Sequence, residues 1–291
     1  MSALLYFNFP YMSSDLNQKI NQAIRFLQSI PDDEPIEIAY SGGKDSDVIL
    51  ELSRMAKINF KAIYKNTTID PPGTISHVLS QGVEIIRPKK TFFELVSRKG
   101  FPYRKARFCC ENLKEYKVLN RAILGIRRCE SNSRAGRYVE PEICREYSKK
   151  DPSKNARHYY PLLDWSNQDI YDFVTLRGIK CHPLYYDEVG EFHVERRLGC
   201  LCCPLTARKH RIEEFLKYPN MVKCYIRAEN IFWETHPSTP MRKYLSNVYE
   251  WFVMQLFCES KEDFRLKFGE NLFSQKTNCR LFLEKYFNID F

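Results

Sequence analysis

The chain has 291 residues, of which 44% are hydrophobic and 14% aromatic, so it is long and apolar enough to bury at least one large core. This composition excludes a disordered chain as the default. No stretch approaches the roughly 18 consecutive apolar residues that a membrane-spanning helix requires, and residues 1–10 lack the basic start and cleavage site of a secretory signal. We therefore expect a soluble, cytoplasmic protein with no membrane partner.

The formal net charge of +9 favours an acidic partner, because opposite charges steer association. A nucleotide, a nucleic acid and an acidic carrier protein all meet this condition. The basic residues are spread along the chain, so solvated surface charge explains them equally well. The charge therefore bounds the class of partner without identifying it.

The first half of the chain alternates between strand and helix patterns. Residues 36–40 form a short β-prone run that ends at a Ser-Gly-Gly turn, and apolar residues then recur at helical spacing. Residues 61–64 and 83–86 repeat the strand pattern with room for helices between them, and residues 122–126 are a fourth candidate. This alternation predicts an α/β protein with a parallel sheet.

The second half is read as a loop followed mainly by helices. Residues 134–158 are polar and predict a surface loop. Residues 166–169 form a capping box ahead of a helix that is expected to stop at Gly178, and helical spacing dominates after residue 207. We therefore divide the chain into an N-terminal helical segment (1–30), a nucleotide-binding domain that contains the cysteine site (31–207) and a helical C-terminal region (208–291).

The loop Ser41-Gly42-Gly43-Lys44-Asp45-Ser46 follows the first strand and is a candidate phosphate site. A glycine pair lets successive backbone N–H groups converge, and the following helix adds its positive N-terminal end. Lys44 adds a mobile positive charge, and two serines add hydroxyl donors. Asp45 can orient a magnesium ion or the lysine. The spacing is not that of a Walker A loop, and an ordinary glycine turn is the alternative.

The eleven cysteines are odd in number and clustered, which does not fit a disulfide framework of a secreted protein. Cys109-Cys110 and Cys200-x-x-Cys203 together offer four thiolates, which suit either zinc or an iron–sulfur cluster. Adjacent cysteines are awkward for a structural zinc site, so the pattern favours a cluster. Unligated thiols and a pairing of Cys200 with Cys202 are the weaker alternatives.

The loop carries a resemblance to a known family. Ser-Gly-Gly-Lys-Asp-Ser after a first strand resembles the PP-loop of ATP pyrophosphatases and of phosphoadenosine phosphosulfate reductases. The resemblance implies a doubly wound, mostly parallel sheet of the adenine nucleotide α-hydrolase-like type, here with a helical C-terminal layer. It also implies ATP or adenylyl sulfate as the bound nucleotide, since the loop holds pyrophosphate in one branch and sulfate in the other.

The cysteines extend this resemblance. A Cys-Cys pair followed much later by Gly-Cys-x-x-Cys is similar to the four-iron four-sulfur arrangement of adenylyl sulfate reductases and of DNA-phosphorothioation pyrophosphatases. The resemblance implies that a 4Fe-4S cluster, with zinc as the alternative metal, is bound by Cys109, Cys110, Cys200 and Cys203.

Shorter matches surround these motifs. Residues 125–128, with Arg134, look like the family's Gly-x-Arg segment near the nucleotide phosphates, and residues 160–166 and 183–185 resemble two further family segments. Solvated surface charge is the alternative reading of these arginines. The resemblance implies catalytic roles for Lys44, Asp45 and Arg127, and nucleotide binding by Ser41, Gly42, Gly43, Lys44, Asp45, Ser46, Arg128 and Arg134.

Two departures affect the expected reaction. Assimilatory reductases end in a Glu-Cys-Gly-Leu-His-like tail, which residues 286–291 do not match, and Cys279 is a poor candidate for its cysteine. Residues 66–72 also differ from the reductases' Asp-Thr-Gly segment and look closer to the phosphorothioation branch. We therefore expect an ATP pyrophosphatase linked to sulfur transfer, with a sulfur-donor protein as a candidate partner.

The alternatives to this expected function come from different classes. A nucleic-acid-modifying enzyme of the phosphorothioation type fits the positive charge, and it would take DNA or RNA as its partner. A true sulfonucleotide reductase fits the loop and the cysteines. A non-catalytic nucleotide sensor or cluster carrier is disfavoured because Lys44, Asp45 and Ser46 are intact.

Overall fold

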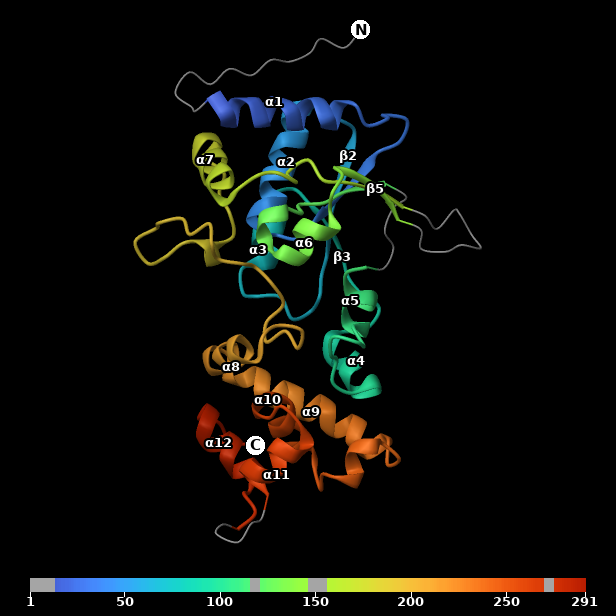
Figure 1. Cartoon of the computed structure of the whole chain (residues 1–291), viewed down its shortest axis with the longest axis vertical. Coiled ribbons are helices and arrows are strands. Elements are labelled where there is room, and N and C mark those ends of the chain that lie inside the picture. The colour runs from blue at the N-terminus through green and yellow to red at the C-terminus, as the bar shows by residue number, and fades with distance from the viewer. Residues whose placement is uncertain (1–13, 116–120, 146–155, 270–274) are drawn as a thin grey trace. The chain divides into compact units, whose positions relative to one another are not determined.

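The computed structural model describes residues 14–115, 121–145, 156–269 and 275–291 (Figure 1). The chain forms two compact units, each with its own core. None of the helices described for these residues is long and apolar enough to cross a membrane. The first unit comprises Met1–Asn66, Pro71–Arg87 and Glu115–Leu198, and the second comprises Thr67–Asp70, Pro88–Lys114 and Gly199–Phe291.

The first unit contains a six-stranded, mostly parallel sheet in the order β3-β2-β1-β4-β6-β5. β1 is central and pairs in parallel with β2 and β4, and only β5 runs antiparallel, against β6. The order reverses at β1, so the loop after β1 lies at the switch point where open α/β sheets bind ligands. The strands are β1 (Ile36–Tyr40), β2 (Phe60–Lys65), β3 (Glu84–Ile86), β4 (Arg121–Ile123), β5 (Glu142–Arg145) and β6 (Ala156–Tyr159).

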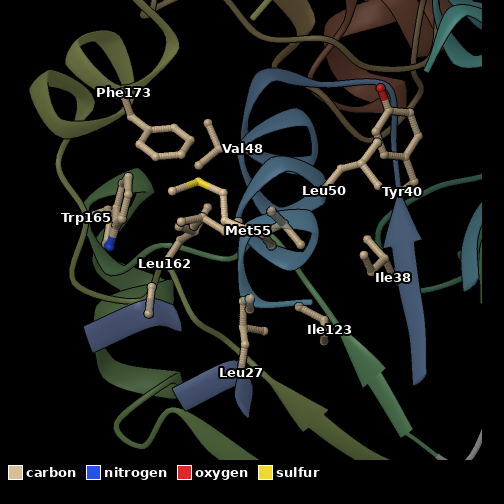
Figure 2. Close-up of a cluster of buried hydrophobic side chains, with 14 of the residues drawn as sticks. Leu27, Ile38, Tyr40, Val48, Leu50, Met55, Ile123, Leu162, Trp165 and Phe173 are labelled. Carbon is tan, nitrogen blue, oxygen red and sulfur yellow. The ribbon is translucent and has the colours of Figure 1, made fainter. Parts of the chain in front are cut away.

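Helices cover this sheet. Four of the five residues of β1 are buried, as expected for a parallel strand that is covered on both faces. Figure 2 shows side chains of α1, α2 and α7 packed together, among them Leu27, Val48 and Phe173. The helices of this unit are α1 (Ser14–Gln28), α2 (Lys44–Ala56), α3 (Thr74–Ser80), α6 (Asn132–Arg137) and α7 (Asn167–Arg177), with short 3-10 turns at Arg128–Glu130 and Pro183–Tyr185.

The second unit is helical. Its core is built largely from aromatic rings, and the ring of Tyr225 lies 5.3 Å from that of Phe215 and 5.5 Å from that of Phe92. Gly100 ends α4 with φ of 76°, and a Cβ there would come within 3.2 Å of Trp251. The helices are α4 (Phe92–Lys99), α5 (Phe108–Leu113), α8 (Arg208–Lys217), α9 (Pro219–Thr235), α10 (Val248–Phe257), α11 (Lys261–Phe268) and α12 (Cys279–Phe287).

The predicted fold class is confirmed, and one predicted loop is wrong. The alternation in the first half, the capped helix that stops at Gly178 and the helical C-terminal region are all present. The polar segment 134–158 is not a surface loop where it is described: it completes α6 and forms β5 and β6, while residues 146–155 lie outside the described residues.

The compact units also divide the chain differently from the three predicted ranges. The second unit contains residues 199–291 together with two segments from the first half of the chain, residues 67–70 and 88–114. Both cysteine pairs therefore belong to the second unit. Of the predicted N-terminal segment 1–30, residues 1–13 lie outside the described residues and α1 fills most of the remainder.

Candidate functional site

The loop between β1 and α2 has the geometry of an anion site. Gly42 adopts φ of 77°, which glycine reaches without steric cost, and a Cβ on Gly43 would come within 3.3 Å of the Tyr185 hydroxyl. Gly43 precedes α2, and no side chain caps the start of this helix. A bound anion can therefore take the capping role at the positive end of α2.

A cavity of about 290 Å³ opens at this loop, close to the lower end of the range for ligand pockets, about 300–1,000 Å³. It lies entirely within the first unit. Gly125 lines it, and a Cβ there would come within 3.2 Å of Asp45, so only glycine permits this approach. The remaining lining residues are Ala39, Ser41, Gly43, Lys44, Asp45, Ser46, Leu124, Ile126, Glu130, Arg134, Tyr185, Arg197 and Leu198.

Lys44 is held in place at the cavity wall. Its side chain is buried, and its Nζ lies 3.2 Å from an Asp45 carboxylate oxygen and 5.3 Å from the ring centroid of Tyr185. Ser46 Oγ donates to the carbonyl of Gly43 at 2.7 Å and lies 3.2 Å from Ser41 Oγ. The lysine charge and the loop are thus positioned before any ligand binds.

Arg127 supports the loop from behind. Its guanidinium is buried, with Nε 2.7 Å from Asp45 Oδ1. Its Nη2 donates to Asn167 Oδ1 at 2.9 Å, and Nη1 to the Trp165 carbonyl at 3.3 Å. Arg127 does not line the cavity itself, but it contacts Asp45, which does.

The two other predicted arginines differ in position. Arg128 bonds Asp164 and donates to the Tyr138 carbonyl at 2.9 Å, and it does not line the cavity. Arg134 does line it and forms an ion pair with Glu130. Arg134 therefore lines the cavity at residues 41–46, whereas Arg128 does not.

Arg197 is a lining residue that no motif indicates. Its Nη2 lies 3.3 Å from Glu130 Oε1, so Glu130 is shared between two guanidiniums. Burial and the neighbouring Arg197 lower the pKa of Arg134. Two positive charges that share one carboxylate leave a net positive charge at the cavity, which favours an anion.

A buried polar network lies beneath the loop. Asp47, in the first turns of α2, is bonded by the Tyr40 hydroxyl and lies 3.0 Å from His77 Nε2. Burial raises the pKa of Asp47, while these hydrogen bonds oppose the shift. His182 accepts a hydrogen bond from Leu184 N on its Nδ1 at 3.0 Å, and burial together with His77 lowers the pKa of His182 to about 4.

The second unit gathers the predicted cysteine ligands. The hydrogen bond from Cys109 and the nearby Arg107 lower the pKa of Cys110 to about 6 against the opposing effect of burial. Burial raises the pKa of Cys203, and the nearby Cys200 and Cys110 add to the effect. The four predicted thiols therefore interact electrostatically with one another.

The extra thiol of Cys202 lies elsewhere. Its side chain is fully buried in the aromatic core of the second unit, and its carbonyl accepts a hydrogen bond from the Tyr225 hydroxyl at 2.9 Å. Cys109 is also buried, whereas the side chains of Cys110, Cys200 and Cys203 are partly exposed. The sequence Cys200-Leu201-Cys202-Cys203 does not indicate which of its three cysteines is fully buried.

Among the described residues, Asp187, Glu191 and His193 bring three ligand atoms within 4.8 Å of one another. His193 Nε2 lies 3.0 Å from Asp187 Oδ2, and that carboxylate raises the pKa of His193. Asp187 Oδ1 also accepts the backbone N–H of Glu191 at 2.8 Å. The ion pair and this turn account for the arrangement without a metal.

Comparisons with known proteins add the following findings. The family model for the phosphoadenosine phosphosulfate reductase domain matches residues 35–206. An uncharacterized protein of Methanocaldococcus jannaschii is 28% identical over 239 residues, which are 74% of this chain and 55% of that protein. Sulfate adenylyltransferase subunit 2 of Photobacterium profundum is 26% identical over 62% of this chain and 70% of that subunit. The chain spans about half the length of the first curated relatives it matches.

The solved structures that match this chain superpose on it only weakly. The phosphoadenylyl-sulfate reductase of Candida auris, in a phosphate complex, has a TM-score of 0.41 and 16% identity over 64% of this chain and 98% of that one. The FMN adenylyltransferase of Candida glabrata has a TM-score of 0.41 and 16% identity over 62% of this chain and 64% of that one. Nothing about activity follows from overlaps of this size.

Proposed function

Because this chain belongs to the phosphoadenosine phosphosulfate reductase family, we propose that it is an enzyme that binds ATP at residues 41–46 and cleaves it to AMP and pyrophosphate. The observation that supports this proposal is the convergence of Lys44, Arg134 and Arg197 on one cavity at the start of α2. Three positive charges beside a helix N-terminus suit a triphosphate.

The proposed reaction is adenylyl transfer. A nucleophilic oxygen of the acceptor attacks the α-phosphorus of ATP, its proton passes to solvent, and the bond from that phosphorus to the bridging oxygen breaks. Pyrophosphate leaves with the electron pair, and the acceptor carries AMP. When water is the acceptor, the products are AMP and pyrophosphate. The leaving pyrophosphate develops negative charge, which positioned cations stabilise.

The residues take distinct roles in this proposal. Lys44 binds the departing pyrophosphate, and Asp45 holds Lys44 while offering its carboxylate to a magnesium ion. Arg127 is a positioning residue, because its guanidinium acts on Asp45 rather than on the cavity. Phosphate oxygens are bound by Arg134 and Arg197 together with the backbone and hydroxyls of Ser41, Gly42, Gly43 and Ser46.

We further propose that Cys109, Cys110, Cys200 and Cys203 hold a 4Fe-4S cluster, which links the enzyme to sulfur transfer. The donor set fits, since four thiols interact in one unit and one of them ionises readily. Four thiols also suit zinc, which iron and sulfide analysis distinguishes from a cluster. A bound cluster would supply electron transfer or sulfur ligation.

The nucleotide proposal is tested by Lys44→Ala. Loss of a charge-assisted contact worth about 1–3 kcal/mol should weaken ATP binding about 5- to 150-fold in calorimetry and slow AMP formation in single-turnover assays. Lys61→Ala removes an exposed lysine on β2 and should change neither quantity. Lys44→Arg retains the charge and should bind ATP more tightly than Lys44→Ala. Equal affinities in all three variants would place the nucleotide elsewhere.

The cluster proposal is tested by anaerobic preparation with iron and sulfide analysis. The protein should be brown, with a broad band near about 400 nm, as thiolate-ligated iron–sulfur centres are. Cys109→Ser and Cys203→Ser should bleach it, whereas Cys202→Ser should retain the colour, since Cys202 is not among the four proposed ligands. Stoichiometric zinc without labile sulfide would contradict the proposal.

A further inference from the structure

Residues 88–114 of the second unit form one of several basic segments of the chain. Residues 88–114 contain eight Lys or Arg and two Asp or Glu, a net charge of +6, whereas the whole chain carries +9. All eight basic side chains are exposed. The segment contains α4, α5 and the turn between them (Figure 1).

A tight turn presents the centre of this charge. The backbone N–H of Ala106 donates to the Tyr103 carbonyl at 2.9 Å, and Tyr103 N donates back at 3.4 Å, which places Arg104 and Lys105 at the tip. Lys99 Nζ lies 5.4 Å from the centroid of the Phe108 ring and links the end of α4 to α5. We call residues 98–107 the basic turn.

The charges at the tip are not neutralised internally. Arg104 and Lys105 form no ion pair with any residue in the described part of the chain, whereas some exposed cations elsewhere in the second unit do. Lys267, for example, lies 2.8 Å from Asp263, and Arg280 lies 3.0 Å from Glu284. Neighbouring like charges repel, so binding a polyanion along the basic turn relieves that repulsion.

The basic turn also carries an exposed aromatic ring. Tyr103 is 58% exposed and directly precedes the two tip cations. A flat ring among cations matches single-stranded nucleic acid, whose unpaired bases stack on aromatic side chains while Arg and Lys bind the phosphates. An acidic protein surface would use the cations but would offer no base to the ring.

We propose that the basic turn binds single-stranded nucleic acid, with phosphates at Arg98, Arg104 and Lys105 and a base stacked on Tyr103. This site shares no residue with the ATP cavity, and it stands whether or not the chain cleaves ATP. The expected partner has two properties: a row of negative charges that the cations bind, and unpaired bases that can stack on the Tyr103 ring.

The test uses the full chain and a fluorescein-labelled 12-nucleotide oligo(dT), with anisotropy measured at several salt concentrations. Arg104→Ala/Lys105→Ala should bind at least about tenfold more weakly, and its slope of log affinity against log salt should fall by about 1.4, since each phosphate contact on a single strand contributes about 0.7. Arg265→Ala/Lys285→Ala removes one exposed arginine and one exposed lysine elsewhere in the unit and should bind like the wild type.

The ring is tested separately from the charge. Tyr103→Ala should weaken oligo(dT) binding at least about fivefold at every salt concentration without changing the salt slope, and Tyr103→Phe should retain the affinity, because stacking uses the ring face. Equal binding by the Arg104/Lys105 variant and its control would overturn the proposal. Equal affinity for a poly-glutamate peptide of the same charge would also overturn the proposal, because the turn would then recognise negative charge alone. Thermal unfolding of each variant checks that these exposed changes leave the fold intact.

Discussion

At the scale of single residues, Glu130 organises the positive wall of the cavity. It pairs with Arg134 and with Arg197, two side chains that lie 63 positions apart in the chain. Arg197→Ala should therefore weaken ATP binding about tenfold, the scale of a lost charge-assisted contact. Arg128→Ala is the matched control, since Arg128 bonds Asp164 outside the cavity, and calorimetry should show little change.

The opposite ranking of these two variants would mean that the cavity rearranges when ATP binds. It would also return Arg128 to the phosphate-binding role that the Gly-x-Arg match implies. Five of the six predicted loop residues, all but Gly42, line the cavity, and the sequence indicates them because they are contiguous and follow a strand. Arg197 has no such signal, because its place at the cavity depends on a fold that brings residues 130 and 197 together.

At the scale of elements, the turn that carries His182 depends on a neutral imidazole. His182 lies 3.1 Å from Thr74 Oγ1 and accepts from Leu184 N, so it links the start of α3 to the 3-10 turn at Pro183–Tyr185. Burial and His77 lower the pKa of His182 from 6.5 to about 4. The unfolded chain thus takes up this proton first, and the stability contributed by His182 is full above pH 6.5 and is lost as the pH falls towards 4.

We predict that His182→Asn flattens this part of the pH dependence. The asparagine oxygen can accept from Leu184 N as Nδ1 does, but it does not titrate. Denaturant unfolding at pH 7.5 and pH 5 should show a smaller difference in the free energy of unfolding for the variant than for the wild type. An unchanged difference would assign the pH dependence to other groups, such as Asp47, whose pKa is raised by burial.

The elements that the sequence predicts well are those with a strong local pattern. The strand 36–40 and the capped helix after Ser166 are recognisable because apolar spacing and capping residues coincide. β5 is not predicted because its four residues, Glu142–Arg145, show no clear apolar alternation. β4 spans only residues 121–123, shorter than the predicted run 122–126.

At the scale of the whole molecule, the three sets of candidate functional residues are divided between the two units. The cavity at residues 41–46 lies in the first unit, and the four predicted ligand thiols and the basic turn lie in the second. The sequence places the thiols with the nucleotide-binding domain, because residues 109 and 110 fall between predicted strands. In the structure, α4 packs against α9, so residues 88–114 belong to the helical unit.

The last prediction concerns the class of reaction, and it rests on Cys279. A reductase of this family needs a thiolate that attacks the substrate sulfur. Cys279 begins α12 and is buried, and burial, aided by Glu250, raises the pKa of its thiol to about 12. This shift disfavours the thiolate at neutral pH.

We therefore predict no thioredoxin-dependent release of sulfite from adenylyl sulfate or its 3′-phosphorylated form by the anaerobically prepared protein. Slow conversion of ATP to AMP and pyrophosphate should be measurable under the same conditions, and Cys279→Ser should leave its rate unchanged. Cys258→Ser is the matched control, because Cys258 is also buried and burial raises its pKa to about 11. Sulfite release that disappears in Cys279→Ser and persists in Cys258→Ser would show that α12 opens to expose a nucleophilic thiol, and the chain would then be a sulfonucleotide reductase.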